Sequence, residues 1–194
     1  MAAYIDPSNR LDWLTPAFVR DDWVLPLLGA IDYDPCGNPA SLIGAVEQSL
    51  GESEDDDGMR HAWHRKGEGR IFLNPTFGER LPKPKEDKPP PPEMPFFHPL
   101  SQWILKCHVE WQRGATIFAV LPAGTDKGWF HRYVTQTAFC LLEKRIPFRL
   151  PEMPSDQKSQ PGNAHMIALW EHNKNQRERF FDLMDPLGFC SEPS

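Results

Sequence analysis

The chain has 194 residues, which is enough for one domain that buries a hydrophobic core. Its formal net charge of −6 argues against a protein that holds nucleic acid by bulk electrostatic attraction, but it leaves room for an enzyme with a local basic face. No apolar run approaches the roughly 20 residues of a membrane helix, and no basic and apolar signal segment opens the sequence. We therefore expect one soluble, intracellular domain over residues 1–194, with loose termini and no membrane contact.

The cysteines and histidines are not spaced for a disulfide framework or a metal site. The cysteines are widely scattered, at Cys36, Cys107, Cys140 and Cys190. No pair has zinc-finger or redox spacing, so we expect free thiols in a reducing compartment. His61 and His64 form a His-x-x-His pair, but a structural zinc needs four ligands. No metal is therefore expected.

The first predicted helix follows a loose polar arm. Thr15 is expected as its N-cap, with Pro16 at the first helical position. Apolar residues at helical spacing extend the helix as far as Gly29; they are Phe18, Trp23, Leu27 and Leu28.

A short strand over residues 30–36 comes next and ends on Asp34 and Pro35. An acid at such a strand end often binds sugar hydroxyls in nucleotide-binding folds. The alternative is a solvated acid that caps the next turn. Residues 38–50 are predicted as a short helix or a loop, and the acidic residues 51–58 as a surface loop.

The stretch Arg70–Gly78 reads as a buried strand that stops on Asn74 and Pro75. The Asn74 side-chain carbonyl and the Pro75 backbone carbonyl are two acceptors, and Phe77 offers an apolar face beside them. Two acceptors and a ring suit the exocyclic amine of a base flipped out of a helix. The alternative is that Asn-Pro only ends the strand.

A proline-rich insertion follows at about residues 79–96, and its composition forbids helix or interior strand. Its lysines are candidates for contact with a phosphate backbone; they are Lys83, Lys85 and Lys88. The alternative is a tolerated insertion without a role in binding.

The second half of the chain alternates helices and strands. An apolar stripe between Phe97 and Trp111 predicts a helix whose stripe faces the core rather than a nucleic acid base. The strongest buried-strand signal is Thr116–Pro122, and the turn after it leads into another helix, with Thr125 or Asp126 as the cap. Further strands are predicted at residues 138–142, 146–150 and 165–170, and a last helix at 173–183 before a frayed end.

Alternating strands and helices predict a three-layer α/β fold with a mostly parallel sheet. Ligands of such sheets bind beyond the carboxyl ends of the strands. Asp34, Asn74 and the segment 122–126 all follow predicted strands, so we expect them to converge on one crevice.

Taken in order, these motifs resemble those of the DNA N-6-adenine methyltransferases of phages and prophages, the Dam-type proteins of temperate phages. The resemblance spans about residues 13–170. Its motifs are Trp13-x-Thr15-Pro16, Asp32-x-Asp34-Pro35-Cys36, Phe72-Leu73-Asn74-Pro75-x-Phe77-Gly78, Trp103, Leu121-Pro122-Ala123-x-Thr125-Asp126-x-x-Trp129-Phe130, Lys144-Arg145-Ile146-x-Phe148 and a final strand ending at Trp170.

The resemblance implies a Rossmann-like methyltransferase fold that uses S-adenosylmethionine as the methyl donor. Thr15, Pro16 and Asn74 would line the donor pocket, with Asp34 near the ribose or the amino acid end. The protein would be phage-encoded and act in the cytoplasm of a bacterial host.

The resemblance also implies that adenine in DNA is the methyl acceptor. Asn74, Pro75 and Phe77 would form the catalytic loop. Beside the insertion lysines, further basic residues are candidates for phosphate contact; they are Arg132, Lys144 and Arg145.

Two features depart from the family pattern. Thr76 stands where the motif has a second proline, so the loop loses one fixed φ angle. The proline-rich insertion also separates the Asn74 motif from the Trp103 helix by more than the family pattern leads us to expect. Independently of the family, no Gly-x-Gly donor-binding turn is present. Two alternatives therefore stay open: a degenerate methyltransferase fold that binds nucleic acid or a protein without turnover, and an enzyme of the same fold that modifies a base differently.

Overall fold

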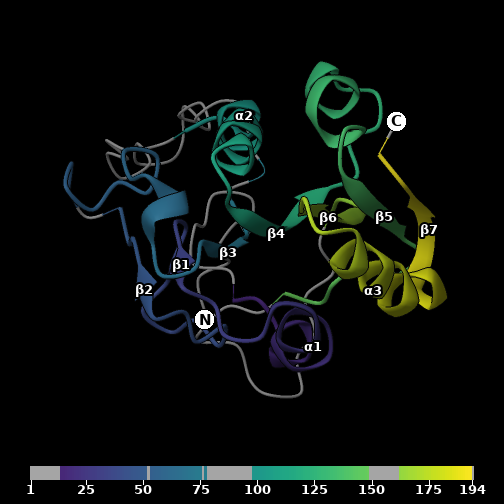
Figure 1. Ribbon diagram of the computed structural model, residues 1–194, viewed down its shortest axis with the longest axis horizontal. Helices are drawn as coiled ribbons and strands as arrows, with labels where there is room; N and C mark the ends of the chain where they lie inside the picture. The colour runs from purple at the N-terminus through teal and green to yellow at the C-terminus, as the bar shows by residue number, and fades with distance from the viewer. Residues whose placement is uncertain (1–13, 52, 76, 78–97, 149–161, 194) are drawn as a thin grey trace, which may run out of the picture.

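The computed structural model describes residues 14–51, 53–75, 77, 98–148 and 162–193. The polar N-terminal arm, the proline-rich insertion at 79–96 and its three lysines lie outside these ranges. The described residues form an α/β structure around one sheet of seven strands, in the order β2-β1-β3-β4-β6-β5-β7 (Figure 1). The strands are β1 (Tyr33–Asp34), β2 (Glu47–Gln48), β3 (Arg70–Leu73), β4 (Thr116–Pro122), β5 (Ala138–Leu142), β6 (His165–Trp170) and β7 (Gly188–Ser191).

The sheet is mixed, so the expectation of a mostly parallel sheet holds for only part of it. The pairs β1–β2, β1–β3 and β3–β4 are parallel. The pairs β4–β6, β5–β6 and β5–β7 are antiparallel. As a result, β6 begins at the edge of the sheet where β1, β3 and β4 end. We call this edge the carboxyl edge, and the opposite edge, where those three strands begin, the amino edge.

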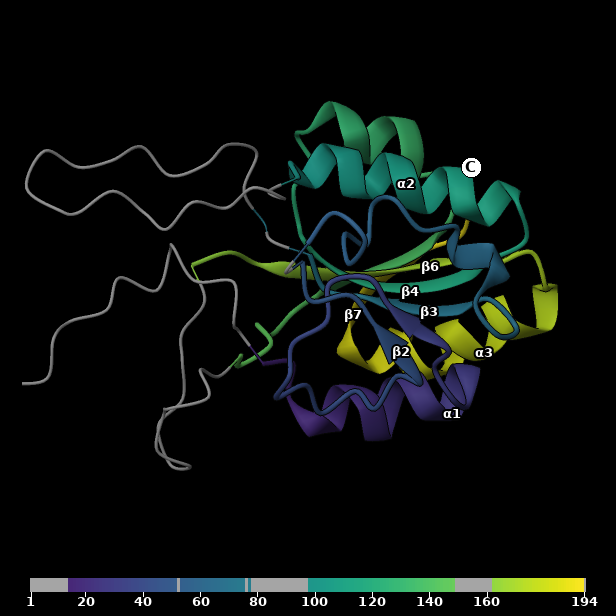
Figure 2. The ribbon, with the colours of Figure 1, turned by 90° about the vertical axis from the view of Figure 1, so that its left-hand side faces the viewer.

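Helices cover both faces of the sheet, which gives three layers (Figure 2). On one face lie α2 (Leu100–Gln112) and the short η4 (Phe130–Val134); on the other lie α1 (Leu25–Leu28), continuous with η2 (Val19–Val24), and α3 (Lys174–Met184). The remaining short helices are η3 (Trp63–Arg65) and η5 (Asp185–Leu187).

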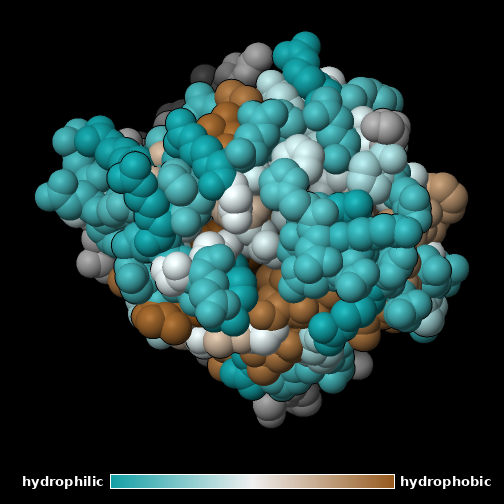
Figure 3. All heavy atoms as spheres, viewed as in Figure 1, coloured by the Kyte–Doolittle hydropathy of each residue, from teal (hydrophilic) through white to brown (hydrophobic). Residues whose placement is uncertain are grey.

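Alternation along the central strands divides the core into two clusters. In β3, Ile71 and Leu73 pack in the cluster that includes α2, whereas Phe72 packs in the cluster that includes α1 and α3. The predicted core stripe of α2 is confirmed, because Leu100, Trp103, Ile104 and Cys107 are buried. The face seen in Figure 3 is mostly hydrophilic, with apolar residues gathered between α1 and α3.

Three local predictions were wrong. Residues 38–50 contain strand β2 rather than a helix or a loop alone, and residues 188–191 form β7 rather than a frayed end. Both are edge strands with exposed or half-exposed side chains, which weakens the alternating pattern that reveals a strand. The predicted strand at 146–150 is not a strand over its described residues, 146–148. All four cysteines are free thiols, as expected.

Candidate functional site

The candidate site lies at the carboxyl edge, between β1 and β3. From β1 the chain passes first to β2 on one side, and later to β3 on the other side. The crevice between β1 and β3 is therefore the point where the strand order reverses. In open α/β sheets this switch point, beyond the strand ends, is where ligands bind.

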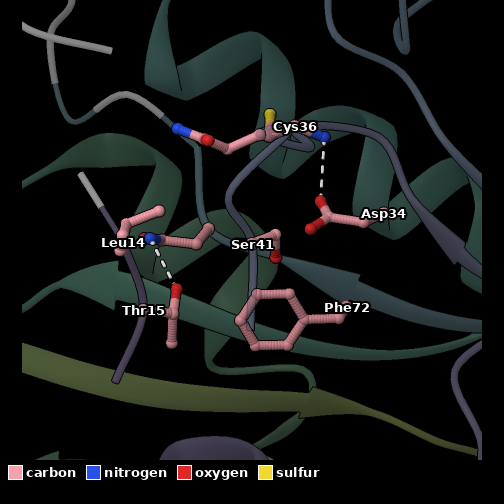
Figure 4. A pocket seen from close by; sticks show the side chains of 8 residues that line it. Leu14, Thr15, Asp34, Cys36, Ser41 and Phe72 are labelled. Atoms are coloured by element: carbon pink, nitrogen blue, oxygen red, sulfur yellow. Dashed lines mark hydrogen bonds between the residues drawn. The ribbon is translucent and has the colours of Figure 1, made fainter. Parts of the chain in front are cut away.

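Three residues singled out in the sequence meet at this point. Thr15, Asp34 and Asn74 line one pocket, which is shown in Figure 4. The other lining residues are Leu14, Cys36, Asn38, Ser41 and Phe72. Pro16 and the segment 122–126 are not among the lining residues, so the expected convergence holds for only part of the set.

Asn74 is held to the segment that precedes the first helix. Its amide nitrogen Nδ2 donates a hydrogen bond to Thr15 Oγ1 over 3.1 Å, across 59 residues of sequence. The N-cap of η2 is Phe18 and has no side-chain cap bond, so the prediction of Thr15 as the N-cap was wrong; its hydroxyl accepts from Asn74 instead. Because the donor end of the amide is engaged by Thr15, a ligand can bind the amide through its acceptor end, Oδ1.

Asp34 is a buried acid with little to stabilise its charge. Its side chain accepts a hydrogen bond from the Cys36 backbone N–H over 3.0 Å (Figure 4), and the residue is 3% exposed. Burial raises its pKa to about 7, although the Cys36 hydrogen bond acts in the opposite direction. A carboxyl group of this kind is poised to accept hydrogen bonds from a ligand.

The pocket is narrow as it stands. The free volume between its walls is about 20 Å³, which is room for one water molecule. A nucleoside-sized ligand therefore needs the walls to separate, and the Thr15–Asn74 hydrogen bond is one of the contacts across it.

An aromatic cluster lies beside the pocket, at the same edge of the sheet. It consists of Phe77, Phe148 and His165, with the His165 ring centroid 5.8 Å from that of Phe77 and 5.2 Å from that of Phe148. Phe77 follows Asn74 by three residues, a span of at most about 11 Å. His165 begins β6 and pairs with Pro122 at the end of β4. Pro75, which lies between Asn74 and Phe77 in sequence, is buried, and Thr76 lies outside the described residues.

His165 is fully buried, and only one of its ring nitrogens has a partner. Nδ1 accepts a hydrogen bond from the Ile146 backbone N–H over 2.9 Å. Nε2 is buried and has no hydrogen-bond partner in the part of the chain that the structure describes. Burial, and to a smaller extent the charge of Arg145, lowers the pKa of His165 to about 4. The ring is therefore neutral near pH 7.

The candidate phosphate-binding residues are only partly brought together. Lys144 and Arg145 are exposed and follow β5 at the carboxyl edge, where Arg145 acts on His165. Arg132 lies in η4, in the layer of α2, with its guanidinium 6.0 Å from the Tyr133 ring centre. Nothing in the described structure joins Arg132 to the other two.

The His61–His64 pair is divided between two other contacts. His64 Nδ1 lies 2.6 Å from Glu110 Oε2, and the His61 ring packs edge-on against Tyr33. Within the described ranges, no three potential metal ligands gather into a group.

Several site residues were missed in the sequence. Cys36 and Phe72 belong to motifs of the resemblance, but their spacing does not indicate that they line a pocket. No sequence pattern points to Ser41. His165 was recognised only as the start of a strand. Its position at the site depends on β6 running antiparallel to β4, which strand composition does not specify.

Comparisons of the chain with models of protein families, with curated proteins and with solved structures find no match. Within the part of the chain that the structure describes, no helix has the length and apolar character needed to span a membrane.

Proposed function

We propose that this protein is a DNA methyltransferase that transfers a methyl group from S-adenosylmethionine to the exocyclic amine of adenine, on a Rossmann-like methyltransferase fold. The observation that carries the proposal is the meeting of Thr15, Asp34 and Asn74 at one pocket. These residues come from three separate parts of the chain, and each belongs to a motif of the resemblance. Phe77, the residue proposed to contact the base, lies directly beyond Asn74.

The position of the pocket supports a nucleotide-like donor. It lies at the switch point between β1 and β3, where open α/β sheets bind such ligands. Asp34 supplies an acceptor for ribose hydroxyls, and its buried charge gains most from such donors. When bound there, S-adenosylmethionine supplies an electrophilic methyl group. Because the free volume is small, binding requires the walls of the pocket to separate.

The acceptor side follows from the orientation of Asn74. The flipped adenine, which leaves its helix at a cost of a few kcal/mol, donates its amine hydrogens to Asn74 Oδ1 and the Pro75 carbonyl. These two contacts direct the amine lone pair toward the methyl group. No strong base is needed, because the amine proton becomes acidic only as the new bond forms. Catalysis is therefore mostly positioning, with Phe77 stacking on the base.

DNA contact in this proposal comes from local basic residues rather than from net charge. Lys144 and Arg145 are at the carboxyl edge with the aromatic cluster. The other candidates are Lys83, Lys85, Lys88 and Arg132. The phage origin and the bacterial cytoplasm as its place of action belong to this same proposal.

A second candidate function is a degenerate methyltransferase fold that binds nucleic acid or a protein partner without turnover. The pocket volume of about 20 Å³ favours it, since the site as it stands has no room for a donor. Calorimetry with S-adenosylmethionine separates the two, because only the enzyme requires donor binding. A third candidate is an enzyme of the same fold that modifies a base differently. Mass spectrometry of treated DNA distinguishes it from an adenine methyltransferase.

The deciding experiment is tritiated-methyl transfer to unmodified DNA by the wild type and Asn74→Ala. We expect the variant to bind donor nearly as well but to lose about 10²–10³ in rate, the typical worth of a preorganised hydrogen-bonding group. The matched control is Asn175→Ala, the same substitution at an exposed position of α3, which should keep full activity. Robust transfer that survives Asn74→Ala would contradict the catalytic assignment, and a wild type that binds no donor would contradict the proposed function.

A further inference from the structure

The aromatic cluster contains a hydrogen-bond donor that the fold does not use. Because His165 Nδ1 accepts from the Ile146 N–H, the proton of the neutral ring is on Nε2. That N–H is buried, with no hydrogen-bond partner among the described residues. A buried donor left unpaired destabilises a folded protein, and a ligand that brings an acceptor to Nε2 would remove that cost.

The imidazole of His165 lies among aromatic rings, the kind of side chain on which a base stacks. Two phenylalanine rings flank the imidazole, Phe77 at 5.8 Å and Phe148 at 5.2 Å between ring centroids. His165 is completely buried, whereas Phe77 is half-buried and follows the loop of Asn74. A base can reach Nε2 only if the Phe77 ring leaves the imidazole and stacks on the base.

We propose that His165 is a specificity-determining residue whose Nε2–H donates to a ring nitrogen of the flipped adenine, at N1 or N7 beside the amine that Asn74 holds. This inference rests on the proposed function and deepens it. Asn74 and Pro75 read the amine, Phe77 contacts the ring face, and His165 requires an acceptor next to the amine. The expected ligand class is a purine with that acceptor pattern.

The test uses short single-stranded oligonucleotides that carry one adenine or one deaza analogue, first in equilibrium binding and then in methyl transfer. We expect the wild type to discriminate about 10- to 100-fold against 1-deazaadenine or 7-deazaadenine, because binding the analogue leaves the donor unpaired. The control, 3-deazaadenine, lacks the nitrogen on the far side and should behave like adenine. Equal binding of adenine and its three deaza analogues, or a loss of affinity confined to 3-deazaadenine, overturns the proposal.

Two variants separate recognition from folding. His165→Asn keeps an acceptor near the Nδ1 position for the Ile146 N–H but has no group at the Nε2 position. His165→Gln places an amide near Nε2. We expect the asparagine variant to lose the discrimination between adenine and its analogue, and the glutamine variant to keep part of it. Discrimination that survives in the asparagine variant overturns the role of His165.

The two readouts distinguish this proposal from the proposed function. Methyl transfer without discrimination refutes the role of His165 and leaves the transferase assignment intact. Discrimination in binding without any methyl transfer supports the role of His165 and refutes the transferase assignment. The protein would then bind a base without catalysing a reaction.

Discussion

The buried acids at the two edges of the sheet differ in their hydrogen-bond partners. At the amino edge, buried acids are surrounded by donors. Glu110 accepts from Lys106 over 2.9 Å and lies 2.6 Å from His64 Nδ1, and Asp32 is held by the forked guanidinium of Arg70 over 3.0 and 3.1 Å. At the carboxyl edge, Asp34, Asn74 and His165 Nε2 have one bond or none among the described residues.

The pKa values follow this division. Burial alone would raise the pKa of Glu110, but its hydrogen bonds to Lys106 and His64 lower it to about 2. Asp34, which stands two residues after Asp32, has no such partners, and burial raises its pKa to about 7. The comparison of these acids separates stability from binding: Glu110 and Asp32 are satisfied within the fold, whereas Asp34 keeps hydrogen-bonding capacity for a ligand.

The largest expected effect is at the amino edge. Glu110→Gln should lower the free energy of unfolding by about 3–5 kcal/mol, because it leaves the cations around the carboxylate without their buried partner. Urea unfolding at pH 7 measures the loss. The matched control is Glu178→Gln, whose exposed pair with Lys174 should contribute less than about 0.5 kcal/mol. If Glu110→Gln costs no more than this control, the amino edge does not stabilise the fold as described.

Asp34→Asn should act in the opposite direction on stability. A folded-state pKa raised from 3.8 to about 7 means that the folded state binds a proton more tightly than the unfolded state. This contribution is fully present below pH 3.8 and is lost as the pH rises through 7. The neutral asparagine should therefore raise the free energy of unfolding at pH 8 by about 2–4 kcal/mol. The two proteins should converge near pH 4.

The same variant should expose the titration of His165. Its lowered pKa makes the unfolded state the tighter proton binder between pH 6.5 and about 4, so this contribution to stability falls on acidification through that window. In the wild type the slopes of Asp34 and His165 oppose each other there. In Asp34→Asn, unfolding should become easier from pH 6.5 to pH 4, and a flat profile would show that His165 is not held neutral by burial.

The sequence predicted the parts of this contrast that depend on local pattern. Apolar runs located β3 and β4, helical spacing located α2 and α3, and the rule of strand ends selected Asp34 and Asn74. The sequence did not show that Arg70 would satisfy Asp32, because that pairing joins residues 38 apart. Nor did the sequence place His165 at the site. The rule for ligand sites considers residues that follow a strand, whereas His165 begins β6, which runs antiparallel to β4.

The pH dependence of donor binding should report the protonation state of Asp34. If ribose hydroxyls bind the carboxylate, a protein with Asp34 protonated must first lose that proton. The dissociation constant for S-adenosylmethionine should then rise about tenfold per pH unit below 7. Calorimetry across pH 5–8 measures this slope, and Asp34→Asn should bind weakly with little dependence on pH. A wild type whose affinity is equal at pH 5 and pH 8 would remove Asp34 from the donor site.

The smallest expected effect concerns Thr15, which holds the Asn74 amide. Thr15→Val keeps the shape of the side chain but removes the acceptor for Asn74 Nδ2. A neutral hydrogen bond of this kind contributes about 0.5–1.5 kcal/mol, or roughly 2- to 12-fold in rate. Since the bond fixes which end of the amide faces the base, the loss should fall on kcat rather than on KM for DNA.

Thr15→Ser, which keeps the hydroxyl, should restore most of the rate. Donor affinity gives the second readout. Because valine keeps the shape of the pocket wall, the dissociation constant for S-adenosylmethionine should stay close to the wild-type value in Thr15→Val. A variant with a lower kcat and unchanged donor binding would show that the contact orients the catalytic amide. If serine and valine behave alike, the hydroxyl orients nothing, and Asn74 is positioned by Pro75 and the strand alone.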